Sequence, residues 1–200
     1  MLKRCALFLD RDGVLIEDDG YICSPKQVRL LPGVAEALAR VNRSGVPVII
    51  ITNQSGIARG WLSENDLQAI HARLDQLLAD AGAYVDRYYY CPHHPEFGQG
   101  EYRQRCGCRK PAPGLLLQAA RDFSLDLGHS FFVGDRLSDL QAGAAAGCHT
   151  ILVRTGLGHR WPEPVPSSSL RLALIAENLT QAVDYCLPYL LHRHWQLQAA

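Results

Sequence analysis

The sequence lacks several features that would assign a chain at once to a familiar class of protein. Lys plus Arg and Asp plus Glu number 20 each, so no net charge attracts a polyanion, and no basic run marks a nucleic-acid binder. No apolar run is long enough to cross a bilayer, and the first one breaks at Asp10, too early for a signal-peptide core. Internal repeats and heptads are also missing. We therefore expect a cytoplasmic monomer without membrane or nucleic-acid partners.

The chain does contain a regular alternation of strand-like and helix-like segments. Strands are predicted over 5–9, 46–51, 84–90, 130–133 and 150–153, with an edge strand over 170–175. Helices are predicted over 34–44, 63–82, 113–123, 140–147 and 179–191, and an irregular, proline-rich connection over 157–169. The alternation predicts an α/β fold with a doubly wound parallel sheet. With 200 residues, 48% of them apolar, we expect a single domain over 1–200.

Two carboxylates separated by one residue follow the first predicted strand. Asp10 and Asp12 would lie at its carboxyl end, where open α/β sheets bind their ligands. Carboxylates so close repel each other unless a cation or a shared proton relieves the repulsion, and a hard divalent ion such as Mg²⁺ does so. A polar turn after the strand is the alternative that the same residues allow.

Other strand ends also carry polar groups. Thr52 begins a polar run after the second strand, Asp135 and Asp139 follow the fourth, and Lys110 precedes the helix that leads to it. For Asp139 two interpretations stand side by side. It orients Lys110 or a water on the metal, or it is an acid favoured at a helix start by the macrodipole.

Three of the seven cysteines cluster with a histidine. Cys91-x-His93 and Cys106-x-Cys108 form two tight pairs at the ends of a loop over 91–108, which has little core of its own. Three thiolates and one imidazole predict a closed tetrahedral Zn²⁺ site with a structural role, whose binding energy orders the loop. His94 is the competing imidazole, and we assign it a surface or substrate-side role.

In this order, Asp10-x-Asp12, Thr52, Lys110 and Gly134-Asp135-x-x-x-Asp139 resemble the signatures of the haloacid-dehalogenase-like phosphatases. The resemblance covers about residues 5–156. It implies that Asp10 is the nucleophile and Asp12 the general acid and base, while Thr52 and Lys110 stabilise the phosphoryl group. It also implies catalytic Mg²⁺ held by Asp10, Asp135 and the main-chain carbonyl of Asp12. Both segments that follow the first two strands are too short for a large cap domain.

The runs Asp-Arg-Asp-Gly-Val, Thr-Asn-Gln-Ser-Gly, Cys-Pro-His-His-Pro and Cys-Gly-Cys-Arg-Lys-Pro narrow the resemblance to the D-glycero-D-manno-heptose 1,7-bisphosphate 7-phosphatases. That family removes the C7 phosphate of a sugar bisphosphate to supply nucleotide-activated heptose for lipopolysaccharide core or surface-layer glycans. The resemblance implies that the substrate is bound by Asp18, Asp19, Gly20, Tyr21, Asn53, Gln54, Ser55, Arg109 and Arg136. For Arg136 the sequence leaves two interpretations open, a phosphate contact or a solvated charge. The related histidinol-phosphate phosphatases share the zinc loop and most of these motifs, and they remain the alternative.

Overall fold

Six parallel strands form one sheet in the computed structural model, which describes residues 3–161 and 168–198. Their order across the sheet is β3-β2-β1-β4-β5-β6, the doubly wound order with β1 at its centre. The strands span Leu7–Leu9 (β1), Val48–Asn53 (β2), Arg87–Cys91 (β3), Phe131–Gly134 (β4), His149–Val153 (β5) and Leu172–Ala176 (β6). The predicted fold class is thereby confirmed.

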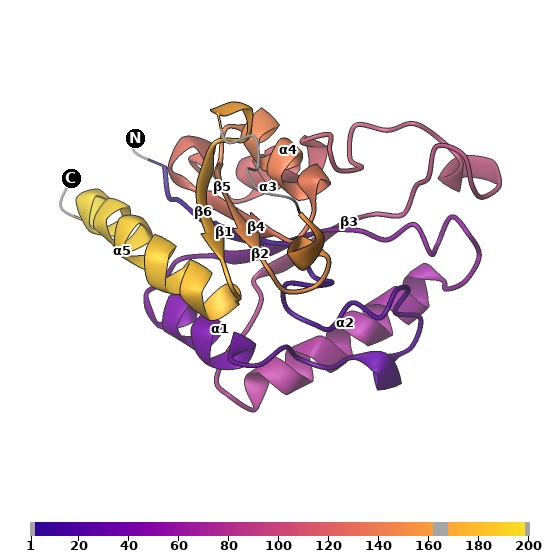
Figure 1. The fold of residues 1–200 in the computed structure, drawn as a ribbon, viewed down its shortest axis with the longest axis horizontal. Coiled ribbons are helices and arrows are strands. Elements are labelled where there is room, and N and C mark those ends of the chain that lie inside the picture. The colour runs from indigo at the N-terminus through magenta and orange to yellow at the C-terminus, as the bar shows by residue number, and fades with distance from the viewer. Residues whose placement is uncertain (1–2, 162–167, 199–200) are drawn as a thin grey trace.

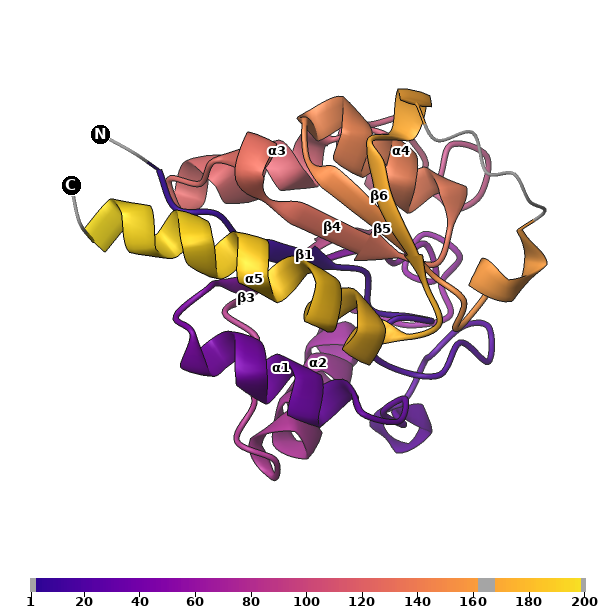
Figure 2. The same ribbon diagram turned by 60° about the vertical axis from the view of Figure 1, so that its left-hand side comes forward.

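Helices cover both faces of this sheet (Figure 1, Figure 2). One face carries α1 (Val34–Arg43), α2 (Glu64–Ala79) and α5 (Leu179–Gln198), and the other carries α3 (Gly114–Asp122) and α4 (Leu137–Ala146). Short 3-10 helices lie in the connections, at Pro25–Gln27 (η1), Gly100–Tyr102 (η2), Leu127–His129 (η3), Gly158–Arg160 (η4) and Ser168–Leu170 (η5). No described helix combines the length and the apolar character that crossing a membrane requires.

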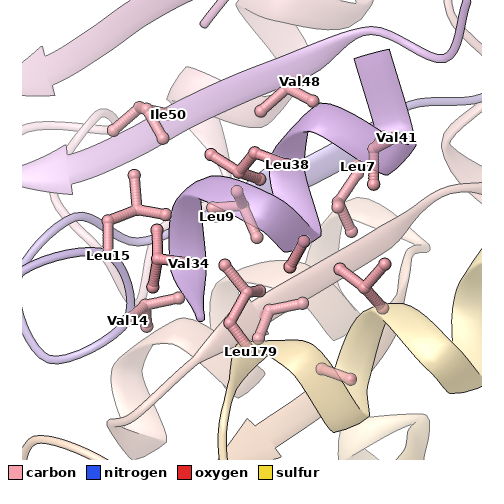
Figure 3. Packing of buried hydrophobic residues seen from close by; sticks show 14 of the residues in the cluster. Leu7, Leu9, Val14, Leu15, Val34, Leu38, Val41, Val48, Ile50 and Leu179 are labelled. Carbon is pink, nitrogen blue, oxygen red and sulfur yellow. The ribbon is translucent and has the colours of Figure 1, made fainter. Parts of the chain in front are cut away.

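The central strand shows why its sequence is almost wholly apolar. Leu7 and Leu9 are fully buried among residues of α1 and α5, as Figure 3 shows, whereas Phe8 is buried in the core on the α3 and α4 side. Successive side chains of a strand point to opposite faces, so a strand covered on both faces needs apolar residues at every position. Leu9 pairs with Ile50 of β2 and Val133 of β4, which aligns the carboxyl ends of the three strands.

Several predicted boundaries shift. β2 begins two residues later than expected and β3 three residues later. The two strands end at Asn53 and Cys91, and these residues form the last pair between them, at the carboxyl edge of the sheet. The α4 helix begins at Leu137 because the carboxylate of Asp139 accepts a hydrogen bond from the Arg136 backbone N–H. Of the proline-rich connection predicted over 157–169, residues 162–167 lie outside the described part.

The connections after β1 and β2 contain only η1, α1 and α2. No separate cap domain is inserted there, as expected. The cleft at the carboxyl ends of the strands is therefore bordered by loops.

Candidate active site

The nucleophile candidate Asp10 directly follows β1. Its backbone N–H donates to the carbonyl of Val133, so the chain is still held in the sheet at this residue. Its Oδ1 atom accepts a hydrogen bond of 2.7 Å from the backbone N–H of Arg11, and the side chain is 7% exposed. The carboxylate is thus fixed by the strand that precedes it and the turn that follows.

Lys110 connects the ends of three elements. Its ammonium nitrogen lies 2.9 Å from Asp10 Oδ1 and 2.7 Å from Asp139 Oδ1, and it donates to the carbonyl of Ile51 at 2.8 Å. Asn53 holds the lysine backbone from both sides, since its amide donates to the Lys110 carbonyl and its Oδ1 accepts from the Lys110 N–H. The second interpretation of Asp139 also applies, because the same carboxylate caps α4.

Asp135 is fully buried behind the cleft. Its Oδ2 accepts a hydrogen bond of 2.8 Å from the backbone N–H of Leu157. Gly13 and Gly156 lie against the same oxygen, and a Cβ atom on either would collide with it. Its Oδ1 has no hydrogen-bond partner among the described residues, and only the Arg136 Nε lies within ionic range, at 3.8 Å.

Oxygen atoms of Asp10, Asp135 and Asp139 lie within 4.8 Å of one another. Among the described residues, Oδ1 of Asp135 and Oδ1 of Asp139 accept no hydrogen bond, although the latter forms an ion pair with Lys110. This set of hard oxygen donors fits a divalent cation such as Mg²⁺. Lys110 contacts Oδ1 of both Asp139 and Asp10, so these distances do not separate the candidate ligands, and Asp10 with Asp135 as the ligands of the ion stays a prediction from the resemblance.

The pKa shifts of Asp10, Asp135 and Lys110 also fit a buried site for a cation. Burial raises the pKa of Asp10 to about 6, with Lys110 opposing the shift and the Asp139 charge adding to it. Burial and then the charges of Asp10 and Asp139 raise the pKa of Asp135 to about 8. Burial alone would lower the pKa of Lys110, but those same two carboxylates raise it, so the lysine is a cation at neutral pH.

Asp12 lies at the rim of the cleft and is held from two sides. Nη2 of Arg11 donates to both carboxylate oxygens, at 2.9 and 3.0 Å, and Nε of Arg11 donates to Oδ1 at 3.2 Å. The Gln54 amide donates to the carboxylate at 3.0 Å. Gln54 also donates to Thr52 Oγ1 at 2.9 Å, which ties the carboxylate to the end of β2. The remaining Arg11 nitrogen lies 3.4 Å from Nε2 of His71, a buried residue of α2.

Most of these residues, though not Asp135 or His71, border a cleft of about 290 Å³. Its lining comprises Asp10, Arg11, Asp12, Gly20, Tyr21, Ile22, Thr52, Asn53, Gln54, Ser55, Arg109, Lys110, Arg136, Ser138 and Asp139. Most of the predicted substrate-binding residues are therefore brought together, and their roles stay predictions.

Asp18 and Asp19 are not part of that lining. Asp18 pairs with Arg136 at 2.7 Å and is 3% exposed, so it anchors an arginine that does border the cleft. Asp19 is 65% exposed and lies 3.7 Å from Arg29, which directs it to the surface.

The predicted zinc ligands also converge. The Sγ atom of Cys108 lies 3.2 Å from those of Cys91 and Cys106 and 3.4 Å from His93 Nδ1. Three sulfurs and one imidazole nitrogen at these separations fit a tetrahedral Zn²⁺ ion. His94 faces elsewhere, since its Nδ1 accepts the backbone N–H groups of Glu96 and Phe97.

Sequence reasoning missed several residues near the cleft. Arg11 is only 1% exposed, although a polar turn would leave an arginine in water. His71 is also buried, and its sequence neighbours do not indicate a site. Neither carries a local signal, because each finds its partner only through the fold. Arg59 and Trp61, from the loop after β2, likewise meet Phe97 from a distant loop.

Comparison with known proteins identifies the class that this fold and site define. Residues 7–76 match the model of the haloacid dehalogenase-like hydrolases, and residues 107–182 match a second HAD-hydrolase-like model. The chain belongs to the haloacid-dehalogenase-like hydrolases.

Two curated relatives and a crystal structure narrow this class. The chain is 47% identical to the D-glycero-beta-D-manno-heptose-1,7-bisphosphate 7-phosphatase of Pasteurella multocida, over 76% of this chain and 82% of the relative. It is 48% identical to the enzyme of that name from Vibrio cholerae, over 78% and 84%. The D,D-heptose 1,7-bisphosphate phosphatase of B. bronchiseptica, solved with magnesium and phosphate, is 38% identical with a TM-score of 0.78, over 92% of this chain and 98% of that one. Within its class, the chain thus groups with the heptose-bisphosphate phosphatases.

Proposed function

We propose that this protein is a Mg²⁺-dependent phosphatase that removes the C7 phosphate of D-glycero-β-D-manno-heptose 1,7-bisphosphate. The observation that carries the proposal is the buried array in which Lys110 joins Asp10 to Asp139. Beside it lies Oδ1 of Asp135, which accepts no hydrogen bond from the described residues. The family to which the chain belongs, and the names of its relatives, support the substrate.

The family resemblance, together with the positions of the chain's own groups, supports the following reaction. Asp10 Oδ attacks phosphorus, the bond from phosphorus to the sugar oxygen breaks, and Asp12 gives a proton to that leaving oxygen. Asp12 then takes a proton from a water molecule, which attacks phosphorus and releases Asp10 and inorganic phosphate. Thr52 donates to a phosphoryl oxygen, and Lys110 compensates the negative charge that builds on the group. Mg²⁺, held by Asp10, Asp135 and the main-chain carbonyl of Asp12, would supply further neutralising charge.

The charge of the cleft supports a substrate with a second anionic group. Arg109 and Arg136 border the cleft together with Lys110, which serves the reacting phosphate. Arg109 is directed by a hydrogen bond of 3.1 Å to the carbonyl of His93, and Arg136 by its ion pair with Asp18. Two arginines beyond the reacting site favour a sugar bisphosphate over histidinol phosphate, whose other end carries an ammonium group.

Zn²⁺ on Cys91, His93, Cys106 and Cys108 is structural, because four protein ligands leave no open position for a water molecule. The product, heptose 1-phosphate, would feed the synthesis of nucleotide-activated heptose for lipopolysaccharide in the cytoplasm, and the enzyme would act as a single domain and a monomer.

The test is phosphate release by purified protein with Mg²⁺ and heptose 1,7-bisphosphate, with the product followed by ³¹P NMR. We expect loss of the C7 signal and retention of the C1 phosphate. The Asp10→Asn variant is the matched control, since it keeps the size of the side chain but loses the nucleophile. No release by the wild-type protein, or full turnover by the variant, would refute the proposal.

A further inference from the structure

Arg59 lies at the centre of three aromatic rings from three separate loops. Its guanidinium carbon is 3.8 Å from the ring centre of Phe97, 5.1 Å from that of Trp61 and 5.7 Å from that of Tyr21. Phe97 belongs to the loop over 91–108 that carries the predicted zinc ligands, which we call the Cys/His loop. Trp61 lies in the loop after β2, and Tyr21 lies in the loop after β1. We call these four residues the Arg59 cluster.

The Phe97 end of the Arg59 cluster is fixed within the Cys/His loop. Nδ1 of His94 accepts the backbone N–H groups of Glu96 and Phe97, each at 3.1 Å, and the His94 and Phe97 rings lie 4.6 Å apart. Gly98, with a φ of +98°, lies so close to the carbonyl of Ala58 that a Cβ atom would collide with it. The tip of the Cys/His loop therefore packs directly on the residues that present Arg59.

The Tyr21 end of the Arg59 cluster reaches the cleft. Tyr21 is the member that borders the cleft, and its ring meets Trp61 edge-on at 4.3 Å. Gly56 lets Tyr21 approach, because a Cβ atom there would lie 3.3 Å from the Tyr21 ring and would collide with Leu62. Three large aromatic rings stay 43–51% exposed around one arginine, although nothing in the core requires them.

We propose that Arg59 is a positioning residue that sets the place of Tyr21, and that it does so by coupling Tyr21 to the Cys/His loop through Phe97. Tyr21 then forms the wall against which the carbon skeleton of a sugar phosphate lies. The inference rests on the proposed function and specifies how the site selects a sugar bisphosphate over a small phosphate ester. A cation held over aromatic faces suits this role, since it fixes three rings without using a directional hydrogen bond.

The experiment compares two substrates in Arg59→Met and Phe97→Ala. For heptose 1,7-bisphosphate we expect kcat/KM to fall by about 5- to 30-fold, mainly through a higher KM. For p-nitrophenyl phosphate, which does not extend to Tyr21, both variants should stay within about twofold of wild type. Phe97→Tyr, which keeps an aromatic ring, should retain the wild-type kcat/KM. Tyr84→Ala, which removes an exposed ring away from the cleft, should leave kcat/KM unchanged.

Double variants test the coupling itself. If Arg59 acts through Tyr21, then Arg59→Met adds no further loss in a Tyr21→Ala background, and Arg59→Met with Phe97→Ala costs no more than either alone. Additive losses, an unchanged KM in Arg59→Met, or equal losses on both substrates would overturn the inference. Failure of the wild-type protein to hydrolyse the bisphosphate would instead overturn the proposed function.

Discussion

The ammonium nitrogen of Lys110 lies 2.7 Å from Oδ1 of Asp139, and both side chains are buried. Because Asp139 also caps α4, the lysine is anchored to the start of a helix while it contacts Asp10. This arrangement predicts that Asp139 influences the reaction by holding Lys110 in place.

Replacing Asp139 by Asn should lower kcat by about 10- to 100-fold with a smaller change in KM, since residues that orient a catalytic group have effects of this size. The asparagine keeps the size of the side chain but leaves Lys110 with one carboxylate partner. Steady-state kinetics on the bisphosphate measure the effect, with Asp184→Asn, at an exposed carboxylate, as the control. Wild-type kcat in Asp139→Asn would show that Lys110 holds its position without this partner.

The pH dependence of stability should reveal the burial of the Asp10 and Asp135 carboxyl groups among other acidic groups. Their pKa values in the folded chain are raised, to about 6 and about 8. The folded chain then binds more protons than the unfolded one, so without Mg²⁺ the free energy of unfolding should fall as pH rises from about 4 to about 8. Added Mg²⁺ should recover this loss most strongly above about pH 8.

Thermal unfolding at a series of pH values, with and without Mg²⁺, makes this measurement. Asp135→Asn should flatten the metal-free pH dependence and weaken the response to Mg²⁺. A stabilisation by Mg²⁺ that is equal at all pH values, or one that survives in Asp135→Asn, would contradict the assignment of Asp135.

His71 should make the opposite contribution to the pH dependence. Burial, and then the charge of Arg11, lower the pKa of this histidine to about 3, from an ordinary value of 6.5. The unfolded chain therefore binds a proton that the folded chain excludes, and stability is lost as pH falls from about 6.5 towards 3, by at most about 1.4 kcal/mol per pH unit.

His71→Gln should reduce that slope, as measured by urea unfolding at a series of pH values. His159→Gln, at an exposed histidine, is the matched control and should leave the slope unchanged. If both variants keep the wild-type slope, His71 is not held neutral by Arg11 and burial.

The Cys/His cluster should hold one zinc ion per chain. Cys106→Ser removes one thiolate and should lower the bound zinc well below one equivalent, and trypsin should then cut more rapidly at Arg103 and Arg105. Cys23→Ser, at a thiol outside the cluster, should change neither the metal content nor the rate of cleavage. Retention of zinc and of protease resistance by Cys106→Ser would refute the assignment.

The elements and motifs that the sequence predicted share one property, which is that their signal is local. The apolar run before Asp10 predicts the central strand, and the end of that run predicts where the Asp10 carboxylate lies. The spacing of Cys91 with His93 and of Cys106 with Cys108 likewise predicts one cluster, and the structure brings these four side chains together. Strand ends were placed less well, because β3 is set by its pairing with β2 and not by its own tyrosines.

What the sequence did not reveal depends on contacts between distant segments. Arg11 is buried because Asp12 and His71 lie on two sides of it, and the neighbouring sequence alone suggests a solvated turn. The two interpretations of Asp139 could not be compared without the fold, which shows that its carboxylate contacts Lys110 and also caps α4. The Arg59 cluster joins three loops whose relative positions no local pattern encodes.

The most direct test of the proposed function is a side-by-side assay of phosphate release with Mg²⁺. The substrates are the β and α anomers of heptose 1,7-bisphosphate, fructose 1,6-bisphosphate and histidinol phosphate, all at equal concentration. We predict the highest kcat/KM for the β anomer of the heptose bisphosphate. A higher value for histidinol phosphate would contradict this account of the substrate, although it would leave the assigned chemistry of Asp10 and Lys110 intact.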